Sequence, residues 1–309
     1  MHRENKFFYE AVESVLNSVD VRPRLIIIDD RLDKSQKLKG NFALIETDSV
    51  GYGAAINASK DLIDTEYVGL MNSDDLSCET RFIKQIFELK FGDISLSTCK
   101  LQKFSGEKMK KIYSLGGSAV GNRHNDYMLL FSSFCANASW VTTSQYWHEK
   151  IYFDTHQNGS DWKLAADLHE EISRWGYLSE PLYYYRQHST QTTKLKTEYD
   201  WVLVKAWEKL NCEKGLPKIP GEIGLNLTFP GIYPPLDLQK VEIENLELWL
   251  LEITKMLTKQ ESEILQRRLT GYIASNFTKP GNLGKKLKLC STTASLSMTR
   301  EFLANRISW

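Results

Sequence analysis

The stretch GYGAAINASKDLIDTEYVGLMNSDD, residues 51–75, decides the fold. It joins small residues at a helix start to a short hydrophobic strand, 67–71, which acidic residues follow. In open α/β sheets, ligands bind beyond the carboxyl ends of the strands. Asp74 and Asp75, with the side-chain oxygen of Asn72, are hard donors suited to Mg²⁺ or Mn²⁺. The stretch therefore predicts a site for a metal-bound anion; the alternative is a solvated turn, because Asn, Ser and Asp are ordinary turn residues.

A second acidic strand end lies upstream. Residues 25–28 (LIII) form the continuous apolar run of a buried parallel strand, and Asp29 and Asp30 follow it. Two buried strands that both end in carboxylates predict one shared crevice. Between them, residues 49–58 supply small side chains where the chain can turn closely past a ligand, and Gly51 is one of them.

Helical and strand patterns alternate along the first two thirds of the chain. The helical segments are 7–16, 54–63, 80–89 and 161–175, and the strands are 25–28, 42–45, 67–71 and 177–185, the last broken by Pro181. This alternation predicts right-handed βαβ units and a mainly parallel sheet flanked by helices. In the helix at 80–89, the predicted apolar set is Phe82, Ile83, Ile86 and Phe87.

The character of the chain changes after residue 195, and residues 196–309 are predicted to form a helical C-terminal extension. Its helical patterns lie at 198–210 and 241–268, and the Pro- and Gly-rich stretch 215–235 predicts a linker or an extended arm. A basic cluster at 285–288, followed by apolar residues, predicts contact with a membrane surface or a partner helix. The alternative is that this tail packs on its own domain.

Composition limits the class of protein. The 309 residues carry a formal net charge of zero, so no overall field attracts nucleic acid or an acidic membrane. The five cysteines are scattered without CxxC spacing, which predicts free thiols in a reducing compartment. No signal peptide opens the sequence and no apolar run is long enough to cross a bilayer. We therefore expect a cytoplasmic protein.

Several motifs in a fixed order resemble the family-2 glycosyltransferases of the GT-A fold. FFYEAVESVL and LIIIDDRLDKS are similar to the family's "FLxEAIxSVLxQ" and "IIVDDxSxD", and residues 51–75 to its "GxSxARNxGxxxAxGEYIxFLDSDD". SDWKLAADLHEEISRWGYLSEPLYYYRQH resembles "EDxxLWLRL…G…EPLYYYRxH". The likeness covers about residues 1–193. It implies a Rossmann-like GT-A domain at 1–195, in which about 1–92 bind a nucleotide-sugar donor and about 93–195 an acceptor.

The resemblance implies roles for the residues of the donor half. Asp29 and Asp30 would lie near the nucleotide base, although Asp29 could instead cap a loop. Asp74 would be the principal ligand of Mn²⁺ or Mg²⁺ and would tie the metal to the diphosphate. The other residues that the resemblance assigns to the donor site are Gly51, Asn57, Asn72, Ser73 and Asp75.

In the acceptor-binding half, Asp161 lies at the position of the family's catalytic carboxylate and would be the general base. Arg186 would approach the diphosphate and His188 the metal; the alternatives are a surface ion pair for Arg186 and an ordinary packed histidine for His188. Trp162 and Trp140 could stack on a sugar in the acceptor groove, or belong to the core.

The sequence departs from the family pattern in three places. The family's first strand, of the form "VSIIIPTYN", has no counterpart before the helix at 7–16, so it lies upstream, is replaced by another segment, or is lost in a degenerate relative. Asn72 replaces the first Asp of the acidic motif, and Ser160 replaces the Glu that commonly precedes the catalytic Asp.

The function expected from these motifs is an inverting, metal-dependent glycosyltransferase. Its donor would be a UDP-sugar and its acceptor a glycan or lipid-linked acceptor of bacterial surface polysaccharide synthesis. It would work at the inner face of the plasma membrane, through a peripheral contact. The main alternative is an inactive GT-A-like binding or scaffold protein. A nucleotidyltransferase is a third reading, but the basic Gly-rich phosphate loop usual near its start is not visible here.

Overall fold

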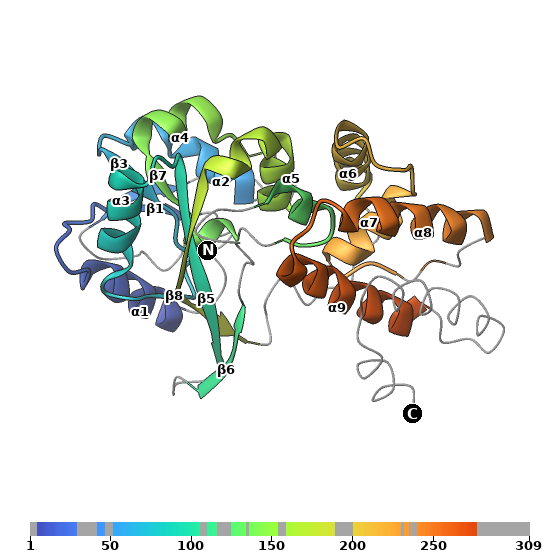
Figure 1. Cartoon of the computed structure of the whole chain (residues 1–309). Helices are drawn as coiled ribbons and strands as arrows, with labels where there is room; N and C mark the ends of the chain where they lie inside the picture. The colour runs from blue at the N-terminus through green and yellow to red at the C-terminus, as the bar shows by residue number, and fades with distance from the viewer. Residues whose placement is uncertain are drawn as a thin grey trace. The chain divides into compact units, whose positions relative to one another are not determined.

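A computed structural model describes residues 5–29, 42–46, 52–105, 110–115, 125–133, 136–153, 159–188, 200–229, 232–234, 236 and 240–276. The chain divides into two compact units (Figure 1). The first unit consists of Met1–His124 and Cys135–Ser189, and the second of Asn125–Phe134 and Thr190–Trp309. The domain boundary predicted at residue 195 falls outside the described residues.

A six-stranded sheet organises the first unit. Its order is β3 (Tyr67–Gly69), β7 (Val141–Thr143), β5 (Leu96–Ser105), β8 (Trp175–Gln187) and β4 (Leu76–Ser77), and β6 (Lys110–Leu115) forms a hairpin with β5. Two further strands, β1 (Ile26–Asp29) and β2 (Ala43–Glu46), pair with each other as a separate parallel sheet. The strands predicted at 25–28, 42–45 and 67–71 are all present.

The prediction of a mainly parallel sheet is not confirmed. In the six-stranded sheet only β5 and β8 run parallel, while the other described pairings are antiparallel. Residue type and hydrophobic periodicity indicate that a segment is a strand, but they do not determine whether it pairs parallel or antiparallel with its neighbour. The sheet is therefore mixed.

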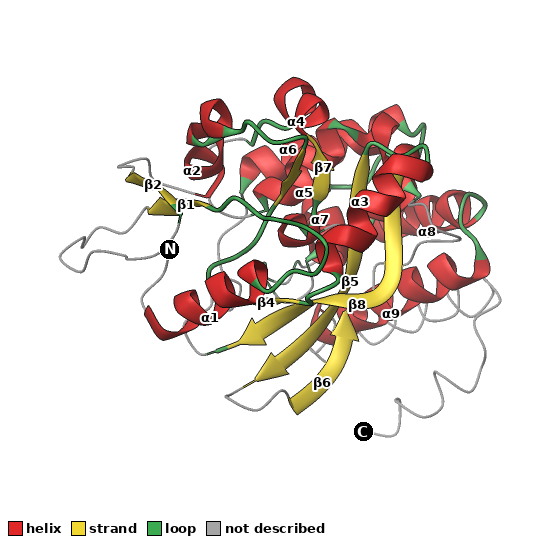
Figure 2. Ribbon diagram, turned by 90° about the vertical axis from the view of Figure 1, so that its left-hand side faces the viewer, coloured by secondary structure: helices red, strands yellow, loops and turns green. Residues whose placement is uncertain are grey.

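The long strand β8 is strongly curved, as Figure 2 shows. Its register against β5 shifts on both sides of Lys100, where Leu178 pairs with Cys99 and Pro181 with Lys100. Proline has no N–H to donate to a ladder, so the irregularity falls where the sequence predicted a break. The curvature carries the end of β8 across to β4, where Tyr183 and Tyr184 pair with Ser77 and Leu76.

Helices flank the sheet of the first unit. They are α1 (Asn5–Leu16), α2 (Tyr52–Ala58), η1 (Lys60–Leu62), α3 (Arg81–Phe91), η3 (Asn137–Ser139), α4 (Ser144–Lys150), α5 (Ser160–Asp167) and η4 (His169–Arg174). Helix α1 buries Phe8, Ala11 and Val15. It is joined to β4 by a hydrogen bond from the Ser77 amide to Ser14 Oγ (3.0 Å).

Helix α3 buries a different face from the one predicted. The buried residues are Arg81, Gln85 and Leu89. Phe87, which the apolar pattern placed in the core, is 62% exposed. Two polar side chains face inward because both find partners there: Gln85 Nε2 donates to the carbonyls of Ser97 (3.0 Å) and Ser139 (2.9 Å), and Arg81 makes the contacts described below.

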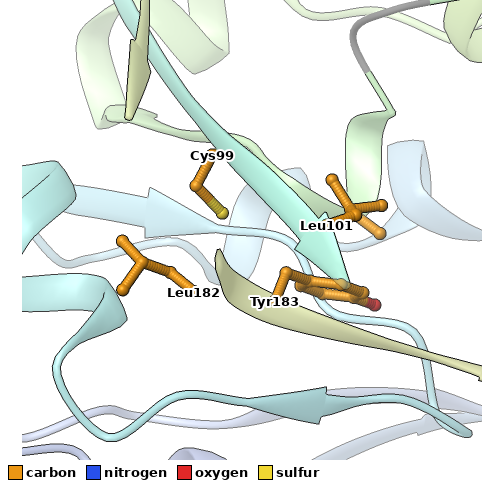
Figure 3. Packing of buried hydrophobic residues seen from close by; sticks show 5 residues of the cluster. Cys99, Leu101, Leu182 and Tyr183 are labelled. Carbon is orange, nitrogen blue, oxygen red and sulfur yellow. The ribbon is translucent and has the colours of Figure 1, made fainter. Parts of the chain in front are cut away.

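One hydrophobic cluster of the first unit's core consists of Cys99, Leu101, Ala138, Leu182 and Tyr183 (Figure 3). Side chains from β5 and β8 meet there, and Met71 and Cys78 pack against its edge. Cys78, Cys99 and Cys212 are free thiols. The cluster lies under the turn that carries Asp74 and Asp75, because Met71 and Cys78 stand at the two ends of that turn.

The second unit is helical where it is described. It contains η2 (Asp126–Leu130), α6 (Trp201–Glu213), α7 (Gly221–Thr228), α8 (Lys240–Thr254) and α9 (Lys259–Asn276). Trp207 and Trp249 are fully buried, and the Nε1 of Trp249 donates to Asn211 Oδ1 (2.6 Å). Helix α7 occupies part of the stretch predicted to be a linker. It is buried because Gly224 lets it approach Trp207, whose Cε2 would lie 1.9 Å from an added Cβ. No described helix could span a membrane.

Candidate functional site

The turn between β3 and β4 brings Asp74 next to His188. The Nε2 atom of His188 lies 2.8 Å from Asp74 Oδ2. The Asp74 and His188 side chains are 32% and 18% exposed, so both can reach a ligand. His188 follows β8, and its ring packs 5.8 Å from that of Phe7. The resemblance assigned both residues to the metal; the structure brings their side chains into contact, and their roles at a metal stay predictions.

Asp75 is buried and points the other way, into the protein. Its Oδ2 accepts hydrogen bonds from the Tyr183 hydroxyl (2.6 Å) and from Asn72 Nδ2 (3.0 Å), and its Oδ1 accepts one from the Arg186 amide (2.7 Å). Burial raises the pKa of Asp75, and the charge of Asp74 raises it further, while the hydrogen bonds act in the opposite direction. Asp75 and Asn72 thus fix the shape of the turn, and Ser73 lies partly buried between them.

The guanidinium group of Arg186 is also occupied inside the protein. The residue is only 2% exposed. Its Nε donates to the carbonyl of Asp74 (2.7 Å), and its Nη2 contacts Glu10 Oε2 at 2.6 Å. The group stacks on Phe7 at 4.3 Å from the ring centroid. The ion pair that the sequence left open is therefore present: its partner Glu10 is 39% exposed, while the guanidinium of Arg186 is buried and also holds the Asp74 backbone.

Arg81 is a second buried guanidinium, and it joins two parts of the site. Its Nη2 donates to the carbonyls of Leu70, at the end of β3, and of Ala138, in η3, both at 2.9 Å. Its Nε donates to Gln85 Oε1 (2.9 Å), and the group lies 5.0 Å from the Tyr183 ring centroid. The turn with Asp74 and the η3 segment are therefore held to the same side chain.

Asp161 stands in the first turn of α5, after Gly159, whose positive φ of 74° suits glycine. Its Oδ1 accepts a hydrogen bond from the Trp162 amide (2.8 Å), and the carboxylate also accepts from the amide of Asn137 in η3. Burial raises the pKa of Asp161, against these hydrogen bonds. A partly buried carboxylate with a raised pKa is a stronger base than a solvated one.

Tyr52, the first residue of α2, relates Asp161 to the acidic turn. Burial is the largest cause of the raised pKa of Tyr52, and the negative charge of Asp161 is the next. The charge of Asp75 also raises this pKa, whereas a hydrogen bond from the Asn137 side chain lowers it. The charges of both carboxylates act on the same phenol. Hydrogen bonds link the two regions as well: Arg81 binds the carbonyls of Leu70 and Ala138, and the amide of Asn137, next to Ala138, donates to Asp161.

Other residues assigned to the donor site have different surroundings. The side-chain amide of Asn57 bonds both backbone groups of Phe153: its Nδ2 donates to the carbonyl (2.7 Å) and its Oδ1 accepts from the amide (3.1 Å). Asn57 thus ties α2 to the segment before α5. Asp29 ends β1 and is 1% exposed. Asp30 and Gly51 lie outside the described residues, so their predicted roles stay predictions.

The two tryptophans proposed for the acceptor lie in the core. Trp140 is 0% exposed and packs against Trp175 (5.2 Å between ring centroids) and Phe153 (5.9 Å). Trp162 is 1% exposed. Neither ring presents a face to a sugar, so the structure corrects the acceptor-groove prediction in favour of the core alternative.

Asp74 and His188 offer an oxygen and a nitrogen of the kinds that bind divalent cations. In this structure the two side chains are hydrogen-bonded to each other, with 2.8 Å between His188 Nε2 and Asp74 Oδ2. Among the described residues, no group of three or more His, Cys, Asp and Glu side chains could hold a metal ion. Phosphate oxygens and water would therefore complete the coordination, as they usually do for Mg²⁺.

Four residues of this site were missed by the sequence analysis: Tyr52, Arg81, Asn137 and Tyr183. Tyr183 lies inside the recognised YYYRQH motif, so its place there was a usable signal. The other three have no sequence signal of their own, because each acts through a neighbour brought close by the fold.

Comparison with known proteins supports the fold. No family model matches the chain, and no curated protein matches it. Among solved structures, S. aureus TarS 1-349 is 13% identical, with a TM-score of 0.51 over 89% of this chain and 86% of that chain. The structure of TarS 1-349 in complex with UDP-GlcNAc has a TM-score of 0.46 and 13% sequence identity, over 94% of this chain and 78% of that chain. The mannosyltransferase PcManGT from Pyrobaculum calidifontis, in complex with GDP-Man and Mn2+, has a TM-score of 0.44 and 10% sequence identity, over 98% of this chain and 80% of that chain. The likeness to TarS 1-349 is one of fold.

Proposed function

We propose that this protein is a glycosyltransferase that moves a sugar from a nucleotide-diphosphate donor to a hydroxyl group of an acceptor. The observation that carries the proposal is that the charges of Asp161 and Asp75 both act on Tyr52, while Asp74, next to Asp75, is hydrogen-bonded to His188. The shared fold with TarS 1-349 and the ordered motifs support the same class of reaction. A UDP-sugar is the donor that we expect.

Asp74 and His188 would hold Mn²⁺ or Mg²⁺ beside the diphosphate. When bound, the metal supplies positive charge that stabilises the departing nucleotide diphosphate. The protein's contribution is to keep the two ligands in place. The Asp74 carbonyl is held by Arg186, and the next residue, Asp75, is held by three hydrogen bonds. The carboxylate of Asp74 is thereby left to face the ligand.

Asp161 is the proposed general base. The acceptor hydroxyl gives its proton to the Asp161 carboxylate while its oxygen forms a bond to the sugar carbon. The bond from that carbon to the diphosphate breaks at the same time, and the leaving group takes the electron pair. A single displacement of this kind inverts the configuration at the carbon. The raised pKa of Asp161 makes its carboxylate a stronger base than a solvated one.

The proposed biological setting is synthesis of a bacterial surface polysaccharide, in the cytoplasm at the inner face of the plasma membrane. The acceptor would be a glycan or a lipid-linked acceptor. The support for this setting is the family resemblance together with the basic and apolar tail at residues 285–309. Flotation of the purified protein with vesicles of anionic lipid tests the membrane contact; protein that stays with the soluble fraction would contradict it.

Calorimetry with UDP and Mn²⁺ tests the enzymatic proposal against a scaffold. Mn²⁺-dependent heat of UDP binding supports the transferase, whereas folded protein without such heat would favour the scaffold. The substitution Asp161→Asn tests the base. It should abolish sugar transfer and leave UDP binding largely intact, because the side-chain shape and the hydrogen bond from the Trp162 amide are kept. A collapse of donor affinity would mean that Asp161 has another role.

A further inference from the structure

Arg81 of α3 is a fully buried cation whose hydrogen bonds go to neutral groups. Its Nε donates to Gln85 Oε1, and its Nη2 donates to the carbonyls of Leu70 and Ala138. Taking a guanidinium group out of water is costly unless its donors find partners. What arginine supplies in such a place is several N–H donors in fixed directions. These contacts indicate a residue that holds backbone groups in place.

On one side, Arg81 holds the start of the acidic turn. Its Nη2 lies 2.9 Å from the carbonyl oxygen of Leu70, and the Leu70 amide donates to the Trp140 carbonyl at 3.0 Å. Both backbone groups of Leu70 are therefore bonded. Asp74 follows in the same turn, so the position of Leu70 sets where the turn begins.

On the other side, Arg81 and Gln85 hold η3. The Nη2 of Arg81 also donates to the Ala138 carbonyl (2.9 Å), and Gln85 Nε2 donates to the Ser139 carbonyl (2.9 Å). The hydrogen bond from Arg81 Nε to Gln85 Oε1 (2.9 Å) joins the two side chains into one unit. Two side chains from consecutive turns of α3 thus fix carbonyls both in η3 and after β3.

The η3 segment in turn donates to the proposed base. The amide of Asn137, the residue before Ala138, donates to the Asp161 carboxylate, and the Asn137 side chain donates to Tyr52. The Trp140 amide closes η3 by donating to the Asn137 carbonyl (2.9 Å). A displacement of the Ala138 carbonyl would therefore move the Asn137 amide, and the Asp161 carboxylate with it.

We propose that Arg81 is a positioning residue for sugar transfer, which sets the location of Asp161 relative to Asp74. The inference rests on the proposed function, in which Asp161 takes the acceptor proton and Asp74 binds the cation beside the donor. Arg81 is buried, so it acts through the carbonyls of Leu70 and Ala138. A misplacement of about 1 Å between reacting groups costs on the order of a hundredfold in rate. Loss of Arg81 should therefore slow the chemical step more than it weakens donor binding.

Arg81→Lys and Gln85→Leu are the test variants. Lysine keeps the positive charge but lacks Nε and the planar fork of arginine, so it cannot make all three hydrogen bonds. Gln85→Leu leaves Arg81 in place and removes its support, which keeps the test decisive if Arg81→Lys does not fold. The matched control is Thr98→Val, which removes a buried hydrogen bond of the same unit, from Thr98 Oγ1 to the Gly176 carbonyl (2.8 Å).

The first measurement compares UDP release with UDP binding. UDP-glucose and UDP-GlcNAc with Mn²⁺ are the donors, and water is the acceptor, so no identified glycan is needed. In both variants, kcat per folded molecule should fall about tenfold or more, while the calorimetric Kd of UDP with Mn²⁺ should change less than about threefold. Binding persists because the acidic turn keeps its hydrogen bonds from Tyr183 and Arg186. Thr98→Val should keep both values, since a purely structural change lowers the folded fraction and not kcat per folded molecule.

The second measurement follows η3 directly, without turnover. In native-state hydrogen exchange by NMR, the Asn137 amide should exchange about tenfold or more faster in both variants, beyond any change at the Ser95 amide, which bonds the Arg174 carbonyl (2.9 Å). Unchanged exchange at Asn137, or unchanged kcat per folded molecule, would overturn the positioning role. A parent protein that releases no UDP from either donor would instead overturn the proposed function, and this inference with it.

Discussion

Removing one hydroxyl group, in Tyr183→Phe, tests how the acidic turn is held. The Tyr183 hydroxyl donates to Asp75 Oδ2 at 2.6 Å and accepts from the Asn72 amide at 3.3 Å. The ring itself is fully buried and stacks on Arg81, and both features survive in phenylalanine. The substitution therefore removes the two hydrogen bonds and little else.

The expected loss follows from these two bonds. A hydrogen bond to a charged group contributes about 1.5–3 kcal/mol and an ordinary one about 0.5–1.5 kcal/mol, and the 3.3 Å bond belongs at the weak end. Tyr183→Phe should thus lower the free energy of unfolding by about 2–4 kcal/mol. Asp75 keeps its bonds from Asn72 and Arg186, so the fold should persist.

Urea unfolding at pH 8, followed by tryptophan fluorescence, measures the loss. The matched control is Tyr9→Phe, because Tyr9 is 44% exposed and its hydroxyl removal should change the free energy of unfolding by less than about 0.5 kcal/mol. A second measurement is the affinity for Mn²⁺, which should fall as the turn carrying Asp74 loosens. If Tyr183→Phe unfolds at the same urea concentration as Tyr9→Phe, Asp75 is not held in the way described.

Three other substitutions test the site and the burial of Glu88 in helix α3. Arg81→Leu should cost about 3–5 kcal/mol in urea unfolding, because the buried carbonyls of Leu70 and Ala138 lose their donor; a loss below about 1 kcal/mol would contradict this. His188→Gln should weaken Mn²⁺ binding by about tenfold or more in calorimetry, and unchanged affinity would remove His188 from the metal site. Burial raises the pKa of Glu88, so the folded state keeps a proton that the unfolded state loses above 4.5, and stability falls as pH rises toward the raised pKa. The stability of Glu88→Gln relative to the parent should therefore increase as pH rises above 4.5, and a difference that does not change with pH would contradict the shift.

The acidic turn could be predicted from the sequence because a strand followed by acidic residues is a local pattern. The strand at 67–71 and the pairing of Asp74 with His188 are both found in the structure. The pattern does not tell which carboxylate points to solvent and which points into the protein. Asp74 and Asp75 are neighbours with the same side chain, yet one is 32% exposed at the side-chain level and the other is buried under Tyr183. That difference is set by β8, which is more than a hundred residues away.

The direction of the strands and the inward face of α3 could not be predicted for a related reason. Hydrophobic periodicity places Phe87 inside, because it counts apolar side chains and ignores what polar ones can bind. In the structure, Arg81 and Gln85 take the inner face, since carbonyl groups of β3, β5 and η3 supply their partners. Phe87 and Phe91 are displaced outward, where they are 62% and 67% exposed.

The two buried arginines explain how a turn rich in negative charge can be kept rigid. Asp74 and Asp75 repel each other, and burial of Asp75 adds to the cost of its charge. Arg186 offsets this by holding the Asp74 carbonyl and by giving its own amide to Asp75, while Arg81 stacks under Tyr183. Because both guanidinium groups are committed to the protein, neither is free to compete for the carboxylate of Asp74. The Asp74 carboxylate is instead hydrogen-bonded to His188, the residue that the proposed function places with it at the cation.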